Sequence, residues 1–341
     1  MPKLALTLVT LGMFALSTAA SADTLHLKNG SKVIGDLLSA KDNTVVFETP
    51  FAGKLTIKQE NIERIITDES VIILLKDGAV YRDRQINASG QELVAIAQGA
   101  DPVVFAMQDV SMINPDPWQL GEGFNWTGNF DAALELERGN SDSDEWRVLG
   151  RSTWRSLKNR YRIDGNLEKE ESNNIETKDK WQIGGKYDRF FSQSKENYYG
   201  ARVRFEYDQF VDLDLRTTIG AYLGRQFFDS SLLALHAELG PVWVDEQFDE
   251  AEDNDFPGAL WEIEATSDIV GFGTELYVFH DGTLNFDSAD DLILNIRIGI
   301  RMPLLYGLQT GLEAKYEYDG GAVEGVDDLD ETYNFFVGYR W

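Results

Sequence analysis

From residue 124 to residue 341, apolar and polar residues alternate along the chain in stretches of about ten residues. In the first stretch, the apolar positions are Trp126, Gly128, Phe130, Ala132, Leu134 and Leu136. This period of two predicts β-strands with one apolar and one polar face. The stretches exceed the roughly five or six residues of a soluble strand, and they match tilted strands that cross a bilayer.

The same pattern recurs to the end of the chain and predicts about twelve antiparallel strands, an even number typical of bacterial outer-membrane barrels. The apolar rows of strands two to eleven begin at Trp146, Tyr161, Trp181, Tyr199, Leu215, Leu233, Trp261, Phe272, Leu292 and Leu312. A soluble β-sandwich would bury these rows in its core, but it does not explain why Trp and Tyr lie near the strand ends. We therefore expect an all-β transmembrane barrel over residues 118–341, in the outer membrane of a Gram-negative cell.

The connections between the predicted strands alternate in length. They are short near Lys158, Asp229 and Pro303, whereas most of the others are longer and acidic, including residues 171–176 and 245–257. Long extracellular loops that alternate with short periplasmic turns are typical of bacterial barrels. This order predicts that both ends of the barrel segment face the periplasm.

The last strand carries an aromatic row on one face. The row consists of Tyr333, Phe335, Val337, Tyr339 and Trp341. A terminal aromatic residue after alternating apolar positions resembles the signal that the barrel-assembly machinery recognises. We therefore expect this machinery as a partner during insertion, and outer-membrane lipid and lipopolysaccharide around the inserted barrel.

The first residues resemble a secretory signal peptide. Lys3 precedes an uncharged run from Leu4 to Leu16, and Ala20-Ser21-Ala22 supplies small residues before a cleavage site. A retained membrane helix would need roughly 20 apolar residues, and this run is shorter. The prediction is a signal peptide over residues 1–22, removed before Asp23.

Residues 23–117 contain an internal repeat. Residues 23–68 and 70–116 align without gaps at an offset of 48, so that TLHLKNG from Thr24 corresponds to IILLKDG from Ile72. Each copy is predicted to be a meander of about five short strands, similar to a small SH3-like or Sm-like barrel. The region holds 9 Lys and Arg against 14 Asp and Glu, which argues against RNA. We expect a periplasmic domain that contacts a protein partner or the cell wall.

Turn residues define the hairpins and the end of this domain. Asn29-Gly30 and Asp77-Gly78 predict type I′ turns, which need a positive φ at both central residues. Asn114-Pro-Asp-Pro-Trp118 then contains two prolines, which remove backbone donors and favour extended backbone. We place the domain boundary there.

Composition excludes several classes of function. The formal net charge of −27 opposes nucleic-acid binding, and the absence of Cys excludes disulfides, zinc–thiolate sites and a thiol nucleophile. There are only three His, and the motifs G-x-S-x-G and H-E-x-x-H are missing. His280 faces the lipid by parity but has no alternating Ser nearby. The acidic segments at 245–255 and 324–331 lack calcium-loop spacing, so we predict no metal site. From the missing motifs we also predict no enzyme and no cofactor.

The polar rows of the strands predict a charged barrel interior. The candidate lumen-lining residues are Asp131, Glu135, Arg147, Arg151, Arg155, Arg202, Arg204, Arg216, Glu238, Glu262, Glu264, Glu275, Arg297, Arg301, Glu313 and Glu317. Arg147 and Arg151 are expected to pair with Asp131 and Glu135 of the preceding strand. Basic residues on one wall and acidic residues on the other would create a transverse field that suits a polar solute. Twelve strands enclose a narrow interior, so an open pore and a packed lumen both remain open.

The barrel segment resembles a known family. The start at Trp126-Thr-Gly, the loop Gly139-Asn140-Ser141, the row that begins at Trp146 and the closing Tyr339-Arg-Trp341 resemble the YdiY-like family of salt-induced outer-membrane proteins. The resemblance implies an outer-membrane barrel without known catalytic residues. The resulting hypothesis is a narrow, porin-like channel or envelope-integrity protein. The alternative is a closed barrel that anchors the periplasmic domain.

Overall fold

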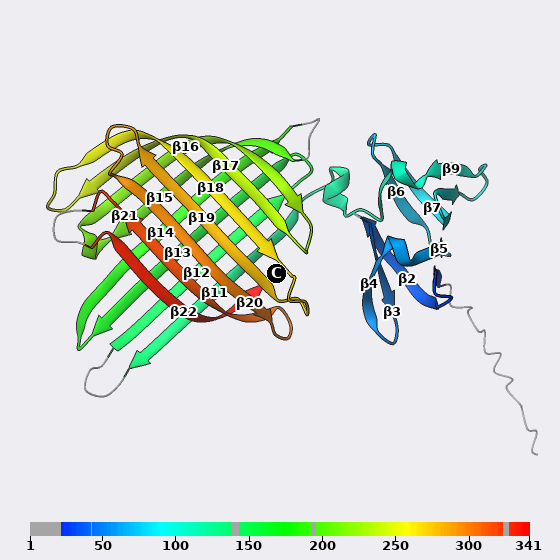
Figure 1. Ribbon diagram of the computed structural model, residues 1–341, viewed down its shortest axis with the longest axis horizontal. Coiled ribbons are helices and arrows are strands. Elements are labelled where there is room, and N and C mark those ends of the chain that lie inside the picture. Colours follow the sequence, from blue (N-terminus) through cyan, green and yellow to red (C-terminus); the bar gives the residue numbers. More distant parts are fainter. Residues whose placement is uncertain (1–21, 42, 138–142, 192–195, 323–326) are drawn as a thin grey trace, which may run out of the picture. The chain divides into compact units, whose positions relative to one another are not determined.

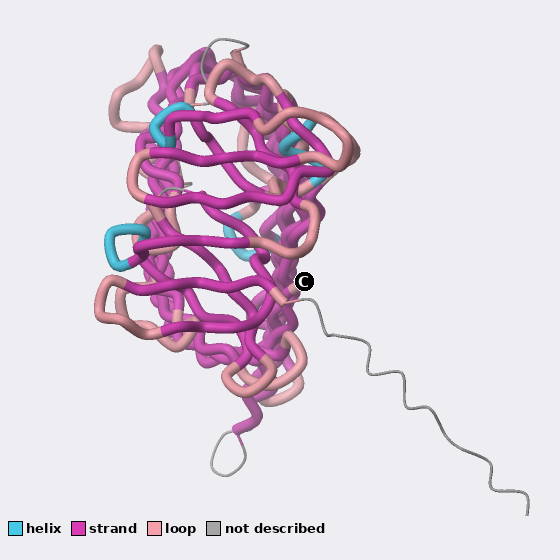
Figure 2. The backbone as a smooth tube through the Cα atoms, turned by 90° about the vertical axis from the view of Figure 1, so that its right-hand side faces the viewer, coloured by secondary structure: helices cyan, strands magenta, loops and turns pink. Residues whose placement is uncertain are grey.

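The computed structural model describes residues 22–41, 43–137, 143–191, 196–322 and 327–341. The chain divides into two compact units, Met1–Asp116 and Pro117–Trp341. Both units are built from β-strands, and the helices among the described residues are short 3-10 turns (Figure 2). These are η1 (Gln59–Asn61), η2 (Met107–Asp109), η3 (Pro117–Leu120) and η4 (Gln209–Val211). No described helix has the length and apolar character that a membrane span requires.

The first unit is one ten-stranded antiparallel sheet with the strand order β1-β5-β7-β6-β10-β2-β3-β4, to which β8 and β9 are added beside β7. Its strands are β1 (Asp23–Leu27), β2 (Lys32–Lys41), β3 (Thr44–Thr49), β4 (Gly53–Lys58), β5 (Ile62–Ile66), β6 (Val71–Leu75), β7 (Val80–Ser89), β8 (Glu92–Ile96), β9 (Val103–Ala106) and β10 (Val110–Ile113). Leu25 and Phe47 from the first five strands pack in one buried core with Ile73, Ile86 and Leu93 from the second five.

The second group of five strands repeats the pairings of the first. In the first group β2 pairs with β1 and β3, β3 pairs with β4, and β5 returns to β1; β6 to β10 follow the same order. Equivalent pairs also join the two groups, since Ile65 lies opposite Ala88 and Ile113 lies opposite Ala40. The two predicted modules therefore share one sheet and one core.

The glycine hairpins of this unit differ from the predicted geometry. Gly30 and Gly78 have φ values of 86° and 91°, but neither Asn29 nor Asp77 has a positive φ. The amide of Gly30 donates to the carbonyl of Leu27 at 2.9 Å. The predicted type I′ turns are therefore wrong. The glycine alone takes the left-handed conformation, as in hairpins closed by a glycine bulge.

The second unit is a closed barrel of twelve antiparallel strands, which confirms the fold predicted from the alternating pattern. The strands run obliquely along the barrel wall (Figure 1). They are β11 (Asn125–Glu137), β12 (Ser143–Arg155), β13 (Asn159–Ser172), β14 (Ile175–Phe190), β15 (Asn197–Asp208), β16 (Leu213–Asp229), β17 (Ala234–Phe248), β18 (Asn254–Ser267), β19 (Glu275–Asn285), β20 (Leu292–Pro303), β21 (Leu308–Asp319) and β22 (Leu329–Arg340).

Alternate residues of the barrel strands form an apolar outer surface. Ile219 and Leu239 are 56% and 63% exposed, whereas the inward neighbour Glu238 is 3% exposed. Exposed apolar side chains in such a band face hydrocarbon in a membrane barrel, and the polar rows then face the interior. The period of two thus assigns the two faces of each strand.

Several connections are shorter than predicted because the strands continue past the apolar rows. The strands β13 and β14 are joined by Asn173 and Asn174 alone, whose φ values of 52° and 60° fit a type I′ turn. The strands β17 and β18 leave only residues 249–253 between them. The predicted long loops at 171–176 and 245–257 are therefore wrong in extent, since their acidic residues extend the strand ladders.

The barrel closes through a short seam between β11 and β22. Four residue pairs join these strands, from Asn129 opposite Arg340 to Ala132 opposite Val337, against thirteen pairs between β11 and β12. The seam lies at the barrel end where β11 begins and β22 finishes, which we call the termini end; the other is the opposite end. Gly128 extends the seam, because its backbone exchanges two hydrogen bonds of 3.2 and 3.1 Å with Trp341.

Candidate functional site in the barrel lumen

The inward rows bring the predicted lumen residues into the barrel interior. Buried among them are Asp131, Arg147, Arg202, Glu238, Glu262 and Glu313. Partly buried are Arg151, Arg155, Arg204, Arg216, Glu264, Glu275, Arg297, Arg301 and Glu317. The side chain of Glu135 lies outside the described residues. The alternation that makes the outer face apolar thus places at least fifteen charged side chains in a space with little water, where each needs a partner.

Some ion pairs join neighbouring strands, such as Arg216 with Glu246, and others cross the lumen. Arg151 Nη1 on β12 lies 2.9 Å from Glu264 Oε1 on β18, which is halfway around the twelve-stranded barrel. Arg162 on β13 reaches the same carboxylate and that of Glu262, each at 3.3 Å. A cross-section at this level is therefore spanned by side chains.

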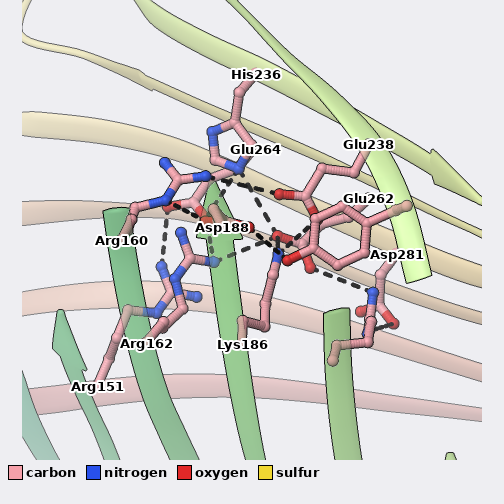
Figure 3. Close-up of polar contacts among 12 residues, drawn as sticks. Arg151, Arg160, Arg162, Lys186, Asp188, His236, Glu238, Glu262, Glu264 and Asp281 are labelled. Carbon is pink, nitrogen blue, oxygen red and sulfur yellow. Dashed lines mark hydrogen bonds and ion pairs between the residues drawn. The ribbon is translucent and has the colours of Figure 1, made fainter. Parts of the chain in front are cut away.

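The largest cluster of charges lies between β13 and β19 (Figure 3). The Lys186 ammonium reaches between two buried carboxylates, 2.6 Å from Glu238 Oε2 and 2.8 Å from Glu262 Oε1. Arg202 adds a contact to Glu262 Oε2 at 3.5 Å. Each carboxylate has more than one cationic partner, which is what allows buried charges to persist away from water.

The same side of the lumen is closed by an apolar cluster, which the sequence analysis missed. Tyr198 and Tyr222 pack there with Val242, Phe256 and Leu260, all 5% exposed or less. The available signal was a break in the alternation, since Val242 and the equally buried Val244 flank the exposed Trp243 on β17. Apolar residues on both faces of a strand indicate that both faces are covered.

The expected pairing between β11 and β12 is not found among the described side chains. Arg147 contacts Glu168 at 3.2 Å and Glu313 at 3.0 Å. Asp131 instead accepts a hydrogen bond from Gln309 at 2.6 Å and lies 3.8 Å from Arg301. Arg147 thus pairs with its ladder neighbour on β13 and with a more distant residue on β21, so adjacency in the ladder determines only some of the partners.

Beside the packed cluster, a cavity of about 290 Å³ occupies the other side of the lumen. We call it the termini-end cavity, because its lining begins at Thr127, Gly128, Asn129 and Arg340. It contains many of the predicted lumen residues: Arg147, Arg151, Arg204, Glu264, Glu275, Arg297, Arg301 and Glu317.

A second cavity of about 120 Å³ lies toward the other end of the barrel, and we call it the opposite-end cavity. Its lining includes Asp208, Val211 and Asp328 beside the connections at that end. The two cavities share four lining residues, which are Asn166, Gln182, Asn295 and Glu317. Three amides and one carboxylate therefore border the junction between two spaces that together reach from one end of the barrel to the other.

Histidine does not form a catalytic centre in the described residues. His236, Glu238 and Glu262 place potential ligand atoms within 4.8 Å of one another, but the Lys186 ammonium already bridges the two carboxylates. On the outer face, the Nε2 atom of His280 accepts a hydrogen bond from the Trp261 indole at 2.9 Å, and its Nδ1 lies 3.1 Å from a backbone carbonyl. Both nitrogens of His280 are thus engaged in structural contacts.

The aromatic row of the last strand lies on the outer face. Tyr333, Phe335, Val337, Tyr339 and Trp341 are between 37% and 68% exposed. The Trp341 ring also stacks on Tyr339 with 6.3 Å between ring centroids. The row is therefore accessible to lipid.

The closed barrel, its apolar outer band and its charged interior define the class of outer-membrane β-barrel proteins. Within this class, residues 130–341 match a family described as "Protein of unknown function, DUF481". The match covers more than half of the chain, so the chain belongs to this family of YdiY-like outer-membrane barrels. The family places the protein in the outer membrane and confirms the resemblance over the barrel segment. No curated protein matches the chain.

The solved structures that match the chain include two porins and an outer-membrane channel. The NanC porin has 9% sequence identity and a TM-score of 0.39, over 62% of this chain and 97% of that chain. The outer-membrane channel DcaP of Acinetobacter baumannii has 11% identity and a TM-score of 0.33, over 94% and 95%. A porin refined at 1.8 Å resolution has 6% identity and a TM-score of 0.31, over 94% and 98%.

Proposed function

We propose that the protein is a narrow, non-enzymatic outer-membrane channel for small polar solutes. The observation that carries this proposal is the pair of cavities that share the lining residues Asn166, Gln182, Asn295 and Glu317. Together they make a polar route along one side of the lumen. The Arg151–Glu264 ion pair limits the width of this route, so that only small solutes fit.

The proposal includes the placement of the chain in the envelope. Residues 1–22 act as a signal peptide, residues 23–117 form a periplasmic domain, and residues 118–341 form the barrel. The barrel-assembly machinery recognises the terminal row that ends at Trp341. Mass spectrometry of the correctly localised protein tests the first part: a chain that starts at Asp23 is expected, and a chain that retains Met1 contradicts it.

A closed barrel that anchors the periplasmic domain is the second candidate. The cross-lumen ion pairs and the apolar cluster around Tyr222 favour it, because they fill one side of the interior. An anchor of this kind would hold the ten-stranded sheet near a periplasmic protein or the cell wall. It would not conduct ions.

Conductance of the purified full-length protein in planar bilayers separates the two functions. The wild-type channel is expected to conduct, and Gln182→Trp should lower the conductance because it adds bulk at the junction of the cavities. The matched control is Ile183→Trp, which introduces the same residue one position along β14 on the 49% exposed outer face. A silent wild-type protein, or equal conductance of both variants, would contradict the channel.

A further inference from the structure

The two lumen cavities carry opposite charge. The termini-end cavity is lined by eight cationic and five anionic side chains, a formal excess of three positive charges. The cationic residues are Arg147, Arg151, Arg162, Arg204, Arg297, Arg301, Lys315 and Arg340, and the anionic residues are Asp164, Glu264, Glu275, Asp281 and Glu317. The opposite-end cavity is lined by two cationic and seven anionic side chains. The positive excess is confined to the lining itself, because four carboxylates that do not line the cavity, Glu168, Glu313, Glu262 and Asp131, contact Arg147, Lys315, Arg162 and Arg301.

One guanidinium of the termini-end cavity makes no direct ion pair with a described residue, although the carboxylate of Glu313 on β21 lies near enough to attract it. Arg297 on β20 forms neither an ion pair nor a hydrogen bond with the described part of the chain, and its Cζ lies 4.4 Å from the ring centroid of Phe279. Arg151 approaches the same ring at 5.8 Å. Arg301, four residues along the inward row of β20, stacks on Tyr277 at 4.1 Å.

This arrangement is suited to an oxyanion. A guanidinium that stacks on an aromatic face keeps its N–H groups free in its own plane, where they bind carboxylate or phosphate oxygens in pairs. Arg297 and Arg151 both lie beside the ring of Phe279, and Arg151 also contacts Glu264 through its Nη1 atom. The volume of about 290 Å³ lies at the small end of ligand pockets, which limits the guest to a small molecule.

We propose that the termini-end cavity binds a small organic anion, with its carboxylate or phosphate group held by Arg297 and Arg151 over Phe279. Arg204 and Arg301 contribute positive potential from the neighbouring walls. The acidic cavity at the other end repels such a solute, so that the anion enters from the termini end. The binding site stands independently of conduction. The direction of entry rests on the proposed channel.

Calorimetric titration of the purified full-length protein in non-ionic detergent tests the binding site. The probes are citrate for the carboxylate class, inorganic phosphate for the phosphate class and glucose as the neutral control. We expect saturable binding of citrate or phosphate and none of glucose. The probe that binds more tightly identifies the class. Absence of saturable binding for both anions overturns the proposal.

A variant pair then assigns the site. Arg297→Gln should weaken anion binding at least tenfold, and the barrel should still fold because Arg297 makes no direct ion pair with a described residue and Glu313 keeps its contact with Arg147 at 3.0 Å. The control is Arg225→Gln, which removes the same charge from an exposed ion pair with Glu196 outside the cavity. Migration of unheated samples on a gel verifies folding. Equal affinity in both variants overturns the assignment.

The outcomes separate this inference from the channel. Anion binding by a barrel that does not conduct would leave the site intact and remove the channel. Conduction without anion binding would support the channel and contradict the anion site. Phe279→Leu provides a second check on the site, because it keeps all cavity charges but removes the aromatic ring on which the Arg297 guanidinium stacks. This change should weaken anion binding less than Arg297→Gln does.

Discussion

The two sides of the lumen are built from the same alternating strands but differ in what fills them. The side between β13 and β19 holds buried carboxylates with several cationic partners and the apolar cluster around Tyr222. The side that faces β12, β20 and β21 holds the larger cavity and the unpaired Arg297. The packed side therefore has buried charges with several partners, whereas the cavity side has open space. Amino-acid changes of the same kind should have different effects on the two sides.

The largest effect is expected for Glu262, which is 2% exposed and lies near Arg162, Lys186 and Arg202. Glu262→Gln removes a negative charge that these buried cations need as a partner. The change should lower the free energy of unfolding by about 3–5 kcal/mol. On the cavity side, Glu275→Gln should cost less, about 1–2 kcal/mol, because Glu275 is 16% exposed and its partners Arg301 and Arg340 are 18% and 56% exposed. Urea unfolding of the two variants measures the difference, and equal losses would contradict the division of the lumen.

A second comparison uses two arginines of the same inward row. Arg147 is 6% exposed and pairs with the buried Glu168 and Glu313, whereas Arg151 is 23% exposed. Arg147→Gln should lower the free energy of unfolding by about 3 kcal/mol, since it leaves buried carboxylates less compensated. Arg151→Gln should cost about 1 kcal/mol and raise the permeability of cations over anions. Unfolding midpoints and reversal potentials report both quantities, and a larger stability loss for Arg151→Gln would refute this order.

The sequence predicted the features that depend on local periodicity. The number of barrel strands, their outward rows and the inward direction of residues such as Arg147 and Glu262 follow from the two-residue repeat of a β-strand. Partners across the lumen could not be predicted in this way. Arg151 and Glu264 are 113 residues apart, and they meet only because of strand tilt, closure and side-chain length.

The N-terminal unit illustrates the same limit. The repeat predicted a meander of about five strands in each copy; the first four strands of each copy pair in that order, whereas the fifth returns to the first. The pairs that join the copies, such as Ile65 with Ala88, are non-local and leave no periodic signal. Likewise, Asn29-Gly30 indicated a turn, but its type depends on the twist and register of the flanking strands.

The seam of the barrel lies on the cavity side and should be sensitive to truncation. Deletion of Trp341 removes the two backbone hydrogen bonds to Gly128 beside a seam of only four residue pairs. The yield of folded barrel should fall while synthesis continues, since each of the two backbone hydrogen bonds contributes about 1 kcal/mol net. Heat-modifiable migration on a gel measures the folded fraction. Deletion with undiminished folding would show that neither the seam nor the proposed assembly signal needs Trp341.

The smallest effect concerns the charge difference between the two cavities. The opposite-end cavity has an acidic lining and the termini-end cavity has a basic one, so the two ends concentrate different ions. At low salt, the currents at voltages of equal size and opposite sign should therefore differ by about twofold. Asp328→Asn combined with Asp330→Asn removes two negative charges from the opposite end and should reduce this asymmetry. Asp268→Asn, in a connection at the termini end outside both cavities, is the matched control.

Salt provides the decisive test of that effect. The Debye length falls from about 10 Å at 0.1 M to about 3 Å at 1 M, which is shorter than the dimensions of the cavities. An asymmetry caused by the charges of the two cavities should therefore disappear at 1 M salt in every variant. An asymmetry that survives at 1 M would have a steric origin. The constriction around Gln182 would then control the current, and the opposite charges of the two cavities would serve binding but not conduction.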